Sequence, residues 1–188
     1  HRLGITSVIG EDLSSVALGS SSVSLMEITA AYGAVANGGI AVKPTTVRST
    51  RDRQGDIVWG AVPDRQQATS PQGAYVLTSL LEGVIQRGTA SKAKVLGLSG
   101  AVAGKTGTTD GYRDAWFVGY TSDVVIGVWL GFDDERSLRL AGSQAALPIW
   151  IDLARRVIPP NVPAFVMPSG VVTRTIDPKT GQLATSQC

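Results

Sequence analysis

Apolar residues recur at the spacing of an amphipathic helix in three stretches of the chain. The first stretch follows Ser24, and Glu27 three residues later completes a capping box, which marks a helix start. The pair Ser70-Pro71 opens the second stretch with proline in the first helical position. Glycine or proline signals end all three stretches. We therefore predict helices between Ser24 and Asn37, between Ser70 and Gly88, and over about 142–157.

The same spacing predicts which side of the first two helices is buried, because apolar side chains gain free energy when they leave water. In the first helix the apolar positions are Leu25, Ile28, Ala31, Tyr32 and Val35. In the second they are Leu77, Leu80, Leu81, Val84 and Ile85.

Alternating and β-branched residues predict strands in the remaining parts of the chain. The predicted strands cover 40–50, 57–59, 103–108, 114–121 and 123–131. The last two are joined by the tight link Ser122-Asp123, whereas a parallel crossover needs about a dozen residues or more. A small hairpin is predicted over 171–184, with its turn at 177–181. These patterns indicate an α+β fold in which helices flank an antiparallel sheet.

Composition and charge exclude several classes of function. The chain has 188 residues, 43% of them hydrophobic, and a net charge of +2 without a basic stripe, so we expect no nucleic-acid partner. Its apolar runs are shorter than a membrane helix, which needs roughly 20 residues, so any membrane anchor must lie outside it. The single histidine is His1 and the single cysteine is Cys188. Cys-His catalysis, a Ser-His-Asp triad and His- or Cys-ligated metals are therefore not expected.

The segment Lys105-Thr106-Gly107-Thr108 carries the strongest chemical signal, and we expect Thr109 to extend it. Alternation along a strand places Thr106 and Thr108 on one face. Gly107 between them lets a ligand backbone approach closely, and Lys105 adds a positive charge. Such a strand suits an extended peptide that ends in a carboxylate. The Thr108 amide could also donate to the oxyanion that develops in acyl transfer.

For several other polar or aromatic residues, the sequence allows either a structural or a functional role. Asp110 and Asp114 could act as an acid-base pair, but carboxylates near a turn more often cap it or pair with a neighbour such as Arg113. The acidic run at 133–135 is typical of a solvated turn rather than a metal site. Trp116 could border a substrate groove, although the aromatic residues of these strands are expected mainly in the core. They are Trp116, Phe117, Tyr120 and Trp129.

Residues 104–121, GKTGTTDGYRDAWFVGYT, resemble the third active-site motif and following strand of class A penicillin-binding proteins. K-T-G belongs to the known signature of that group, and a bare triplet would be a weak match. Further stretches also resemble the family, so the resemblance covers nearly the whole chain. They are residues 17–39, Gln86-Arg87-Gly88-Thr89-Ala90, Ala145 to Trp150, and Ile176 to Gly181.

The resemblance implies a penicillin-binding protein and serine β-lactamase type of fold, of which 1–160 would be the C-terminal part of the transpeptidase domain and 161–188 a tail. It implies a peptidoglycan D,D-transpeptidase that acts through an acyl-serine without a metal or cofactor. The catalytic positions carried over are Lys105 and Thr108. The substrate-binding positions are Lys105, Thr106, Gly107, Thr108 and Thr109. Implied ligands are stem peptides ending in D-Ala-D-Ala and β-lactam antibiotics.

The resemblance also implies a larger parent protein. Such proteins carry a glycosyltransferase domain and a membrane anchor, and they work on the outer side of the bacterial cytoplasmic membrane. The chain has no initiator methionine or signal sequence, so we expect a piece of a longer polypeptide. The N-terminal part of the same domain would then be its partner.

The family nucleophile, in a Ser-x-x-Lys motif at a helix start, has no convincing counterpart in this chain. The stretch Ser91-Lys92-Ala93-Lys94 has that spelling but lies in a loop, only 14 residues before Lys105. A Ser-x-Asn motif is also absent. We therefore expect the isolated chain to be inactive. Two alternatives stay open: a serine β-lactamase of the same fold, and a binding module without catalysis.

Overall fold

The computed structural model describes residues 2–10, 16, 19–91, 101–177 and 180–184. Outside these residues lie His1, Cys188, part of the stretch 17–39, the Lys92-Ala93-Lys94 half of the Ser-x-x-Lys spelling, and positions 178–179 of the predicted turn.

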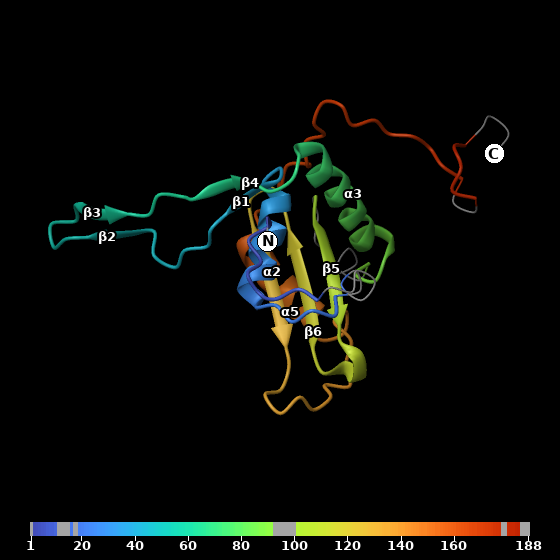
Figure 1. The fold of residues 1–188 in the computed structure, drawn as a ribbon, viewed down its shortest axis with the longest axis horizontal. Coiled ribbons are helices and arrows are strands. Elements are labelled where there is room, and N and C mark those ends of the chain that lie inside the picture. The colour runs from blue at the N-terminus through green and yellow to red at the C-terminus, as the bar shows by residue number, and fades with distance from the viewer. Residues whose placement is uncertain (1, 11–15, 17–18, 92–100, 178–179, 185–188) are drawn as a thin grey trace.

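A three-stranded antiparallel sheet forms the centre of the fold (Figure 1). It contains β5 (Ala103–Thr108), β6 (Ala115–Tyr120) and β7 (Val125–Leu130), in the order β5-β6-β7. The three predicted strands are confirmed, with β6 and β7 one or two residues shorter at their ends. The Thr121 hydroxyl closes the link between them by accepting hydrogen bonds from the amides of Asp123 and Val124, each at 3.2 Å.

Helices cover both faces of this sheet. On one face lies α5 (Ala146–Val157), where the Trp150 ring contacts Phe117 with a centroid distance of 5.0 Å. On the other face lie α2 (Leu25–Ala36) and α3 (Pro71–Arg87), which enclose the buried Tyr120 ring. This arrangement confirms the predicted α+β fold with helices on an antiparallel sheet.

The start of α2 shows the predicted capping box. The Ser24 hydroxyl accepts from the Glu27 amide at 3.2 Å, and the Ser24 amide donates to the Glu27 carboxylate at 3.0 Å. The same carboxylate accepts from the amides and hydroxyls of Thr6 and Ser7. These hydrogen bonds hold the pKa of Glu27 far below its ordinary value, because they stabilise the ionised form. Glu27 therefore fastens the N-terminal segment to the helix.

The prediction of one continuous strand over 40–50 was wrong. The structure has β1 (Ile40–Val42) paired with β4 (Arg65–Gln67), and β2 (Ser49–Arg51) paired with β3 (Ile57–Gly60). Pro44 lies just after β1, where it has no amide to continue a ladder. The polar strand β4 was not predicted. These strands form an arm: the pair β1-β4 lies at its base, where β1 contacts α2, and the pair β2-β3 projects from the body (Figure 1).

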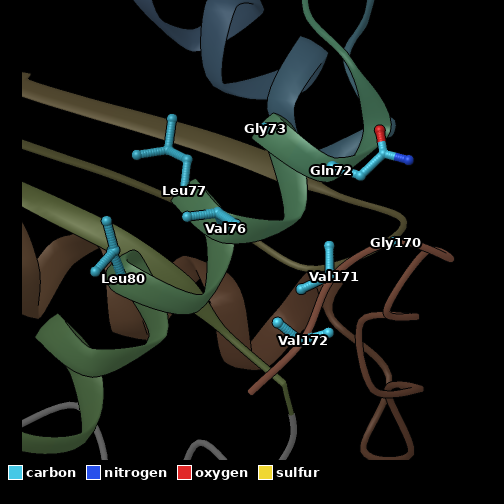
Figure 2. Close-up of a pocket in the computed structure, with 8 residues that line it drawn as sticks. All are labelled: Gln72, Gly73, Val76, Leu77, Leu80, Gly170, Val171 and Val172. Atoms are coloured by element: carbon cyan, nitrogen blue, oxygen red, sulfur yellow. The ribbon is translucent and has the colours of Figure 1, made fainter. Parts of the chain in front are cut away.

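The inward face predicted for α3 was partly wrong. Leu81 and Ile85 are buried together with Ala74 and Thr78, but Leu77 and Leu80 have exposed fractions of 41% and 66%. The sheet covers only the side of the helix that carries the four buried residues. Leu77 and Leu80 line a groove of about 480 Å³ together with Val171 and Val172 of the tail, which lie across from them in Figure 2. The amide of Gln72 ties this tail by donating to the Ser169 carbonyl at 2.9 Å.

The predicted inward face of α2 also differs in part. Ala31 and Val35 are buried with Ala34, whereas Leu25 is exposed and Ile28 and Tyr32 are half-buried. Leu25 lies at the first turn of α2, where it lines a hollow between α2, β1 and β7 and keeps an exposed side chain.

The aromatic residues of the sheet divide into buried and surface positions. Phe117 and Tyr120 are fully buried, as expected. Trp116 is half-buried, and Trp129 is 40% exposed, so its prediction as a core residue was wrong. The Trp129 ring lies beside Trp116, with their centroids 6.1 Å apart. Both rings are near the end of the sheet at which the loop joins β5 to β6.

The helix predicted from about residue 142 begins at Ala146 instead. Residues 141–145 form a turn in which the Ala145 amide donates to the Ala141 carbonyl at 3.0 Å. This turn brings Gly142 against the sheet.

In the tail, Ile176 and Leu183 form an isolated antiparallel bridge, and the Asp177 amide donates to the Gln182 carbonyl at 2.8 Å. These contacts lie on either side of the predicted turn at 177–181.

Candidate functional site

The strand β5 lies at one edge of the sheet as the structure describes it, so one side of its backbone faces away from β6. Its register to β6 separates its side chains into two sets. Thr106 is opposite Phe117, which packs on α5, whereas Lys105 is opposite Val118. Opposed residues in an antiparallel pair point to the same face. We call the face with Thr106 and Thr108 the hydroxyl face, and the face with Lys105 the lysine face.

Lys105 therefore lies on the opposite side of the strand from the two hydroxyls. Its ammonium donates to the carbonyl of Thr106 at 3.0 Å, so it turns back along the backbone of β5. The side chain is exposed, and no carboxylate among the described residues forms an ion pair with it. The charge of Lys105 is thus available to a ligand at the strand edge.

The Thr106 hydroxyl has a partner from the end of α3. Its Oγ1 lies 2.8 Å from Oγ1 of Thr89, and either hydroxyl can be the donor. Thr89 directly follows Gly88, the residue that caps α3, where the chain turns toward β5. The two hydroxyls come from positions 17 residues apart in the sequence.

The Thr108 hydroxyl has a partner from the turn before α5. Its Oγ1 accepts a hydrogen bond from the amide of Gly142 at 3.0 Å, across 34 residues of sequence. Gly142 can come this close because it has no side chain. A Cβ at this position would overlap the carbonyl oxygens of Gly107 and Trp116. The turn and the strand therefore fit together only with glycine here.

Gly107, predicted to admit a ligand backbone, also makes room for its own sheet. A Cβ at Gly107 would lie 3.0 Å from Cβ of Trp116 on the neighbouring strand. That distance is tighter than ordinary van der Waals contact, so glycine is favoured even without a ligand.

Thr109 differs from the two threonines before it. Its hydroxyl donates to the Asp114 carboxylate at 3.1 Å and accepts from the Asp114 amide at 2.8 Å. A hydroxyl has one proton, so none remains for a ligand anion. The other oxygen of Asp114 accepts from the Trp129 indole at 2.9 Å. The geometry of Asp114 therefore favours a structural role over acid-base catalysis, because this residue closes the loop between β5 and β6.

The loop after β5 is tied to the loop after β7. The Leu138 amide donates to the Tyr112 carbonyl at 2.7 Å, and the Ser137 hydroxyl donates to the Gly111 carbonyl at 2.6 Å. Within the loop after β5, Asp110–Tyr112 forms a short 3-10 turn, and the Asp110 side chain is exposed. These bonds hold the two loops together at the end of β5 that carries Thr108.

The acidic run at 133–135 pairs with arginines at the surface. Arg113 contacts Glu135 at 3.3 Å, and Arg136 contacts Asp134 at 3.4 Å. All four side chains are more than half exposed, which agrees with a solvated turn. Within the described part of the chain, acidic, histidine and cysteine side chains form no cluster that could hold a metal ion. None of the helices described here is both long and apolar enough for a membrane span.

Thr89 and Gly142 belong to this site, and reasoning from the sequence did not assign a role to either. Thr89 had a signal, because it lies in the stretch Gln86–Ala90 that leads into the motif strand. Gly142 had none, since a glycine near a predicted helix start has many ordinary explanations.

Comparison with known proteins shows which family and fold the chain is similar to. Residues 4–152 match the family model described as "Penicillin binding protein transpeptidase domain". The chain is 39% identical over 178 residues to penicillin-binding protein 1A of Aquifex aeolicus (strain VF5), which covers 93% of this chain and 24% of the relative. The chain thus spans about a quarter of the length of that relative.

Solved structures show the same fold. A crystal structure of penicillin-binding protein 1A from Haemophilus influenzae superposes with a TM-score of 0.88 at 23% identity, covering 97% of this chain and 33% of that one. The PonA1 protein of Mycobacterium tuberculosis in complex with penicillin V superposes with a TM-score of 0.73 at 23% identity, covering 91% of this chain and 51% of that one.

Proposed function

Because the chain belongs to the penicillin-binding protein transpeptidase family, we propose that it forms the substrate-binding part of a peptidoglycan D,D-transpeptidase. The observation that carries this proposal is the strand β5. It presents two threonine hydroxyls on one face and, on the other, an ammonium that has no ion-pair partner among the described residues, at the edge of the sheet.

Each group of β5 has a role in this proposal. The edge of β5 pairs with the extended backbone of a stem peptide that ends in D-Ala-D-Ala. The hydroxyls of Thr106 and Thr108 donate to the terminal carboxylate, and the charge of Lys105 attracts it. The Thr108 amide donates to the oxyanion when the carbonyl before the last D-Ala is attacked. β-Lactams, which have a carboxylate beside a reactive carbonyl, would bind the same groups.

The reaction is acyl transfer through a serine supplied from outside this chain. Attack by the serine oxygen on the penultimate D-Ala carbonyl forms an ester, and the C–N bond to the last D-Ala breaks. That D-Ala leaves as an amine after its nitrogen takes up the proton that the serine hydroxyl loses. An amine of a neighbouring stem peptide then attacks the ester, the C–O bond to the serine breaks, and a proton from the amine returns to the serine oxygen, which leaves the cross-link and the free serine. The groups on β5 bind and orient the acyl donor in both steps.

Ser91 does not suit the role of nucleophile. It lies in a turn after α3, where its amide donates to the Gly88 carbonyl at 3.1 Å, and it is only 14 residues before Lys105 in the sequence. We therefore place the Ser-x-x-Lys and Ser-x-Asn motifs in the upstream part of the same domain.

An apolar hollow supports an upstream partner. A space of about 710 Å³ lies between α2, β1 and β7, and the exposed side chain of Met26 lines it. The hydroxyl oxygen of Thr29, which also lines it, is buried without a hydrogen-bond partner among the described residues. Because the chain spans only 24% of the Aquifex relative, the upstream part of the transpeptidase domain is the occupant that we propose.

The parent protein would follow the organisation of class A penicillin-binding proteins. In this proposal residues 1–160 complete the transpeptidase domain, and 161–188 form a tail. A glycosyltransferase domain and a membrane anchor lie outside the chain. The transpeptidase would then work on the outer face of the cytoplasmic membrane.

Labelling with a fluorescent penicillin tests the proposal. The complete transpeptidase should form one stable covalent adduct per molecule, and this chain by itself should form none. Adduct formation at Ser91 in the isolated chain would overturn the assignment of the nucleophile. Steady turnover of the penicillin by the complete protein would indicate a β-lactamase instead, and a complete protein that is never acylated would indicate a binding module without catalysis.

A further inference from the structure

We propose that Thr89 and the Gly142 amide are positioning groups that turn the hydroxyls of Thr106 and Thr108 into hydrogen-bond donors toward a ligand carboxylate. The inference rests on the proposed function of β5 and adds to it two groups from outside the motif. Neither Thr89 nor Gly142 needs to touch the ligand, because each acts through a threonine of β5.

The argument for Gly142 is a count of protons. A threonine hydroxyl has one proton to donate and two lone pairs that can accept. The Gly142 amide can only donate, and it occupies a lone pair of Thr108 Oγ1 at 3.0 Å. The proton of Thr108 therefore has to point elsewhere, and it is available to an acceptor at the ligand site. A bond to an ionised acceptor is about twice as strong as a neutral one.

The argument for Thr89 is one of direction. Its hydroxyl and that of Thr106 lie 2.8 Å apart and form one hydrogen bond. The two hydroxyls have two protons, so one of these protons is available to another acceptor. A carboxylate bound to Thr106 can only accept. Its presence therefore favours the order in which Thr89 donates to Thr106 and Thr106 donates to the carboxylate. Hydrogen bonds in such a chain polarise one another, so Thr89 strengthens the bond of Thr106 to the ligand.

Thr109 provides an internal comparison. It follows the same strand and has the same side chain, but its proton is donated to Asp114 at 3.1 Å. The surroundings therefore leave protons on Thr106 and Thr108 for a ligand, while they use that of Thr109. Selection of an anion at this strand depends on the partners of each hydroxyl as well as on the motif.

The positions of the two partners are set by different parts of the fold. Thr89 lies in the turn that ends α3, and Gly142 lies in the turn before α5. Ala90, next to Thr89, is fully buried in the core that α5 covers, which holds that turn in place. The close fit of Gly142 against the carbonyls of Gly107 and Trp116 holds the other.

The test compares two ligands in the complete transpeptidase: a penicillin with a free carboxylate and its methyl ester. In Thr89→Val the second-order acylation rate should fall about fivefold for the acid, as expected for one lost hydrogen bond, and less than twofold for the ester. Thr89→Ser should restore the rate with the acid. Thr50→Val, which removes an exposed hydroxyl from the arm, is the matched control and should leave both rates unchanged.

A double-mutant cycle tests whether the effect passes through Thr106. In a Thr106→Val background, adding Thr89→Val should cost less than twofold with the acid, because the group through which it acts is gone. In the same way, Gly142→Ala should lower the acid rate in the parent protein and add little in a Thr108→Val background. Gly60→Ala, where an added Cβ meets no atom within 4 Å, is the control for the glycine change.

The outcomes separate this inference from the proposed function. Equal losses for the acid and the ester, or fully additive effects in the cycles, would show a structural role and overturn the inference alone. Unchanged acid rates in Thr89→Val and Gly142→Ala would do the same. A parent enzyme that forms no penicillin adduct would overturn the proposed function and this inference with it. If Gly142→Ala fails to fold, the Thr89 variants and their cycle still decide.

Discussion

The two faces of β5 differ in how their polar groups are held. On the hydroxyl face, Thr106 and Thr108 each have a fixed partner, Thr89 and Gly142, that comes from a distant part of the chain. On the lysine face, the hydrogen-bond partner of the Lys105 ammonium among the described residues is the carbonyl of its own neighbour, Thr106, at 3.0 Å. One face is therefore organised before a ligand arrives, whereas the other has a flexible cation.

This difference indicates two kinds of contribution to binding. Hydroxyls that are already oriented lose little freedom when they bind, so they can discriminate by geometry. A lysine is a compact charge on a flexible stem, and it contributes mainly by attraction at longer range. The following predictions, from the largest expected effect to the smallest, test whether the two faces behave in these two ways.

Removal of the core beneath the hydroxyl face should have the largest effect. Trp150 is fully buried, contacts Phe117 and donates from its indole to the Ile126 carbonyl at 2.9 Å. Trp150→Ala should lower the free energy of unfolding of the transpeptidase domain by about 3–5 kcal/mol, as measured by urea denaturation. The exposed Trp59 of the arm is the control, and its replacement by alanine should cost less than about 1 kcal/mol. Equal losses would contradict the burial that the fold assigns to α5.

Loss of one organised hydroxyl should mainly affect catalysis. Thr108→Val keeps the volume of the side chain but removes the donor to the ligand carboxylate. We expect acylation by penicillin to weaken by about 1.5–3 kcal/mol, the usual worth of a hydrogen bond to a charged group. Stopped-flow acylation rates measure the change, and an unaltered melting temperature shows that the fold is intact. Thr109→Val is the comparison variant, because the proton of Thr109 is already donated to Asp114 and is not available to the ligand carboxylate. An unchanged rate for Thr108→Val would remove this residue from the site.

Removing the charge of Lys105 should slow acylation, because the electrostatic attraction for the ligand carboxylate is lost. Lys105→Met keeps the length of the stem but removes the ammonium, and acylation should fall at least about tenfold, or 1.4 kcal/mol. Because an exposed charge acts through solvent, the effect should shrink as salt concentration rises, whereas that of Thr108→Val should not. Lys105→Arg should rescue only part of the rate, since a planar guanidinium differs in shape from an ammonium. A Met variant with the wild-type rate would argue decisively against a role for this charge.

The smallest effect is expected in the core beneath the lysine face. The Tyr120 hydroxyl lies 2.9 Å from that of Thr78 in a buried setting, so Tyr120→Phe should cost about 0.5–1.5 kcal/mol of stability at neutral pH. Burial raises the pKa of Tyr120 from its ordinary 10.0 to about 12. A raised folded pKa gives stability that is complete below pH 10 and is lost as pH rises toward 12.

The stability difference between wild type and Tyr120→Phe should therefore narrow above pH 10, because only the wild type has this tyrosine to ionise. Melting temperatures at pH 7 and at pH 11 measure this change. A constant difference across that range would show that Tyr120 is not shielded from water in the folded protein.

Local signals in the sequence were enough to predict most elements of this fold. Ser24 and Glu27 identified the start of α2, Pro71 identified the start of α3, and the short link at Ser122-Asp123 required antiparallel pairing. Each signal acts within a few residues, so the sequence shows it directly. The prediction failed where a neighbour decided the outcome: Leu77 and Leu80 have the right spacing for a buried face, but the sheet does not reach them.

The sequence by itself determined that Thr106 and Thr108 share one face of their strand, because side chains alternate along any strand. Only the tertiary structure decided that Thr89 and Gly142 meet those hydroxyls. These contacts join positions 17 and 34 residues apart, and they depend on how α3 and α5 pack on the sheet. A hydrogen bond requires its atoms to approach within about 3 Å, and no local pattern specifies such an approach between distant segments. The motif is therefore readable in the sequence, whereas the groups proposed to orient its hydroxyls exist only in the folded chain.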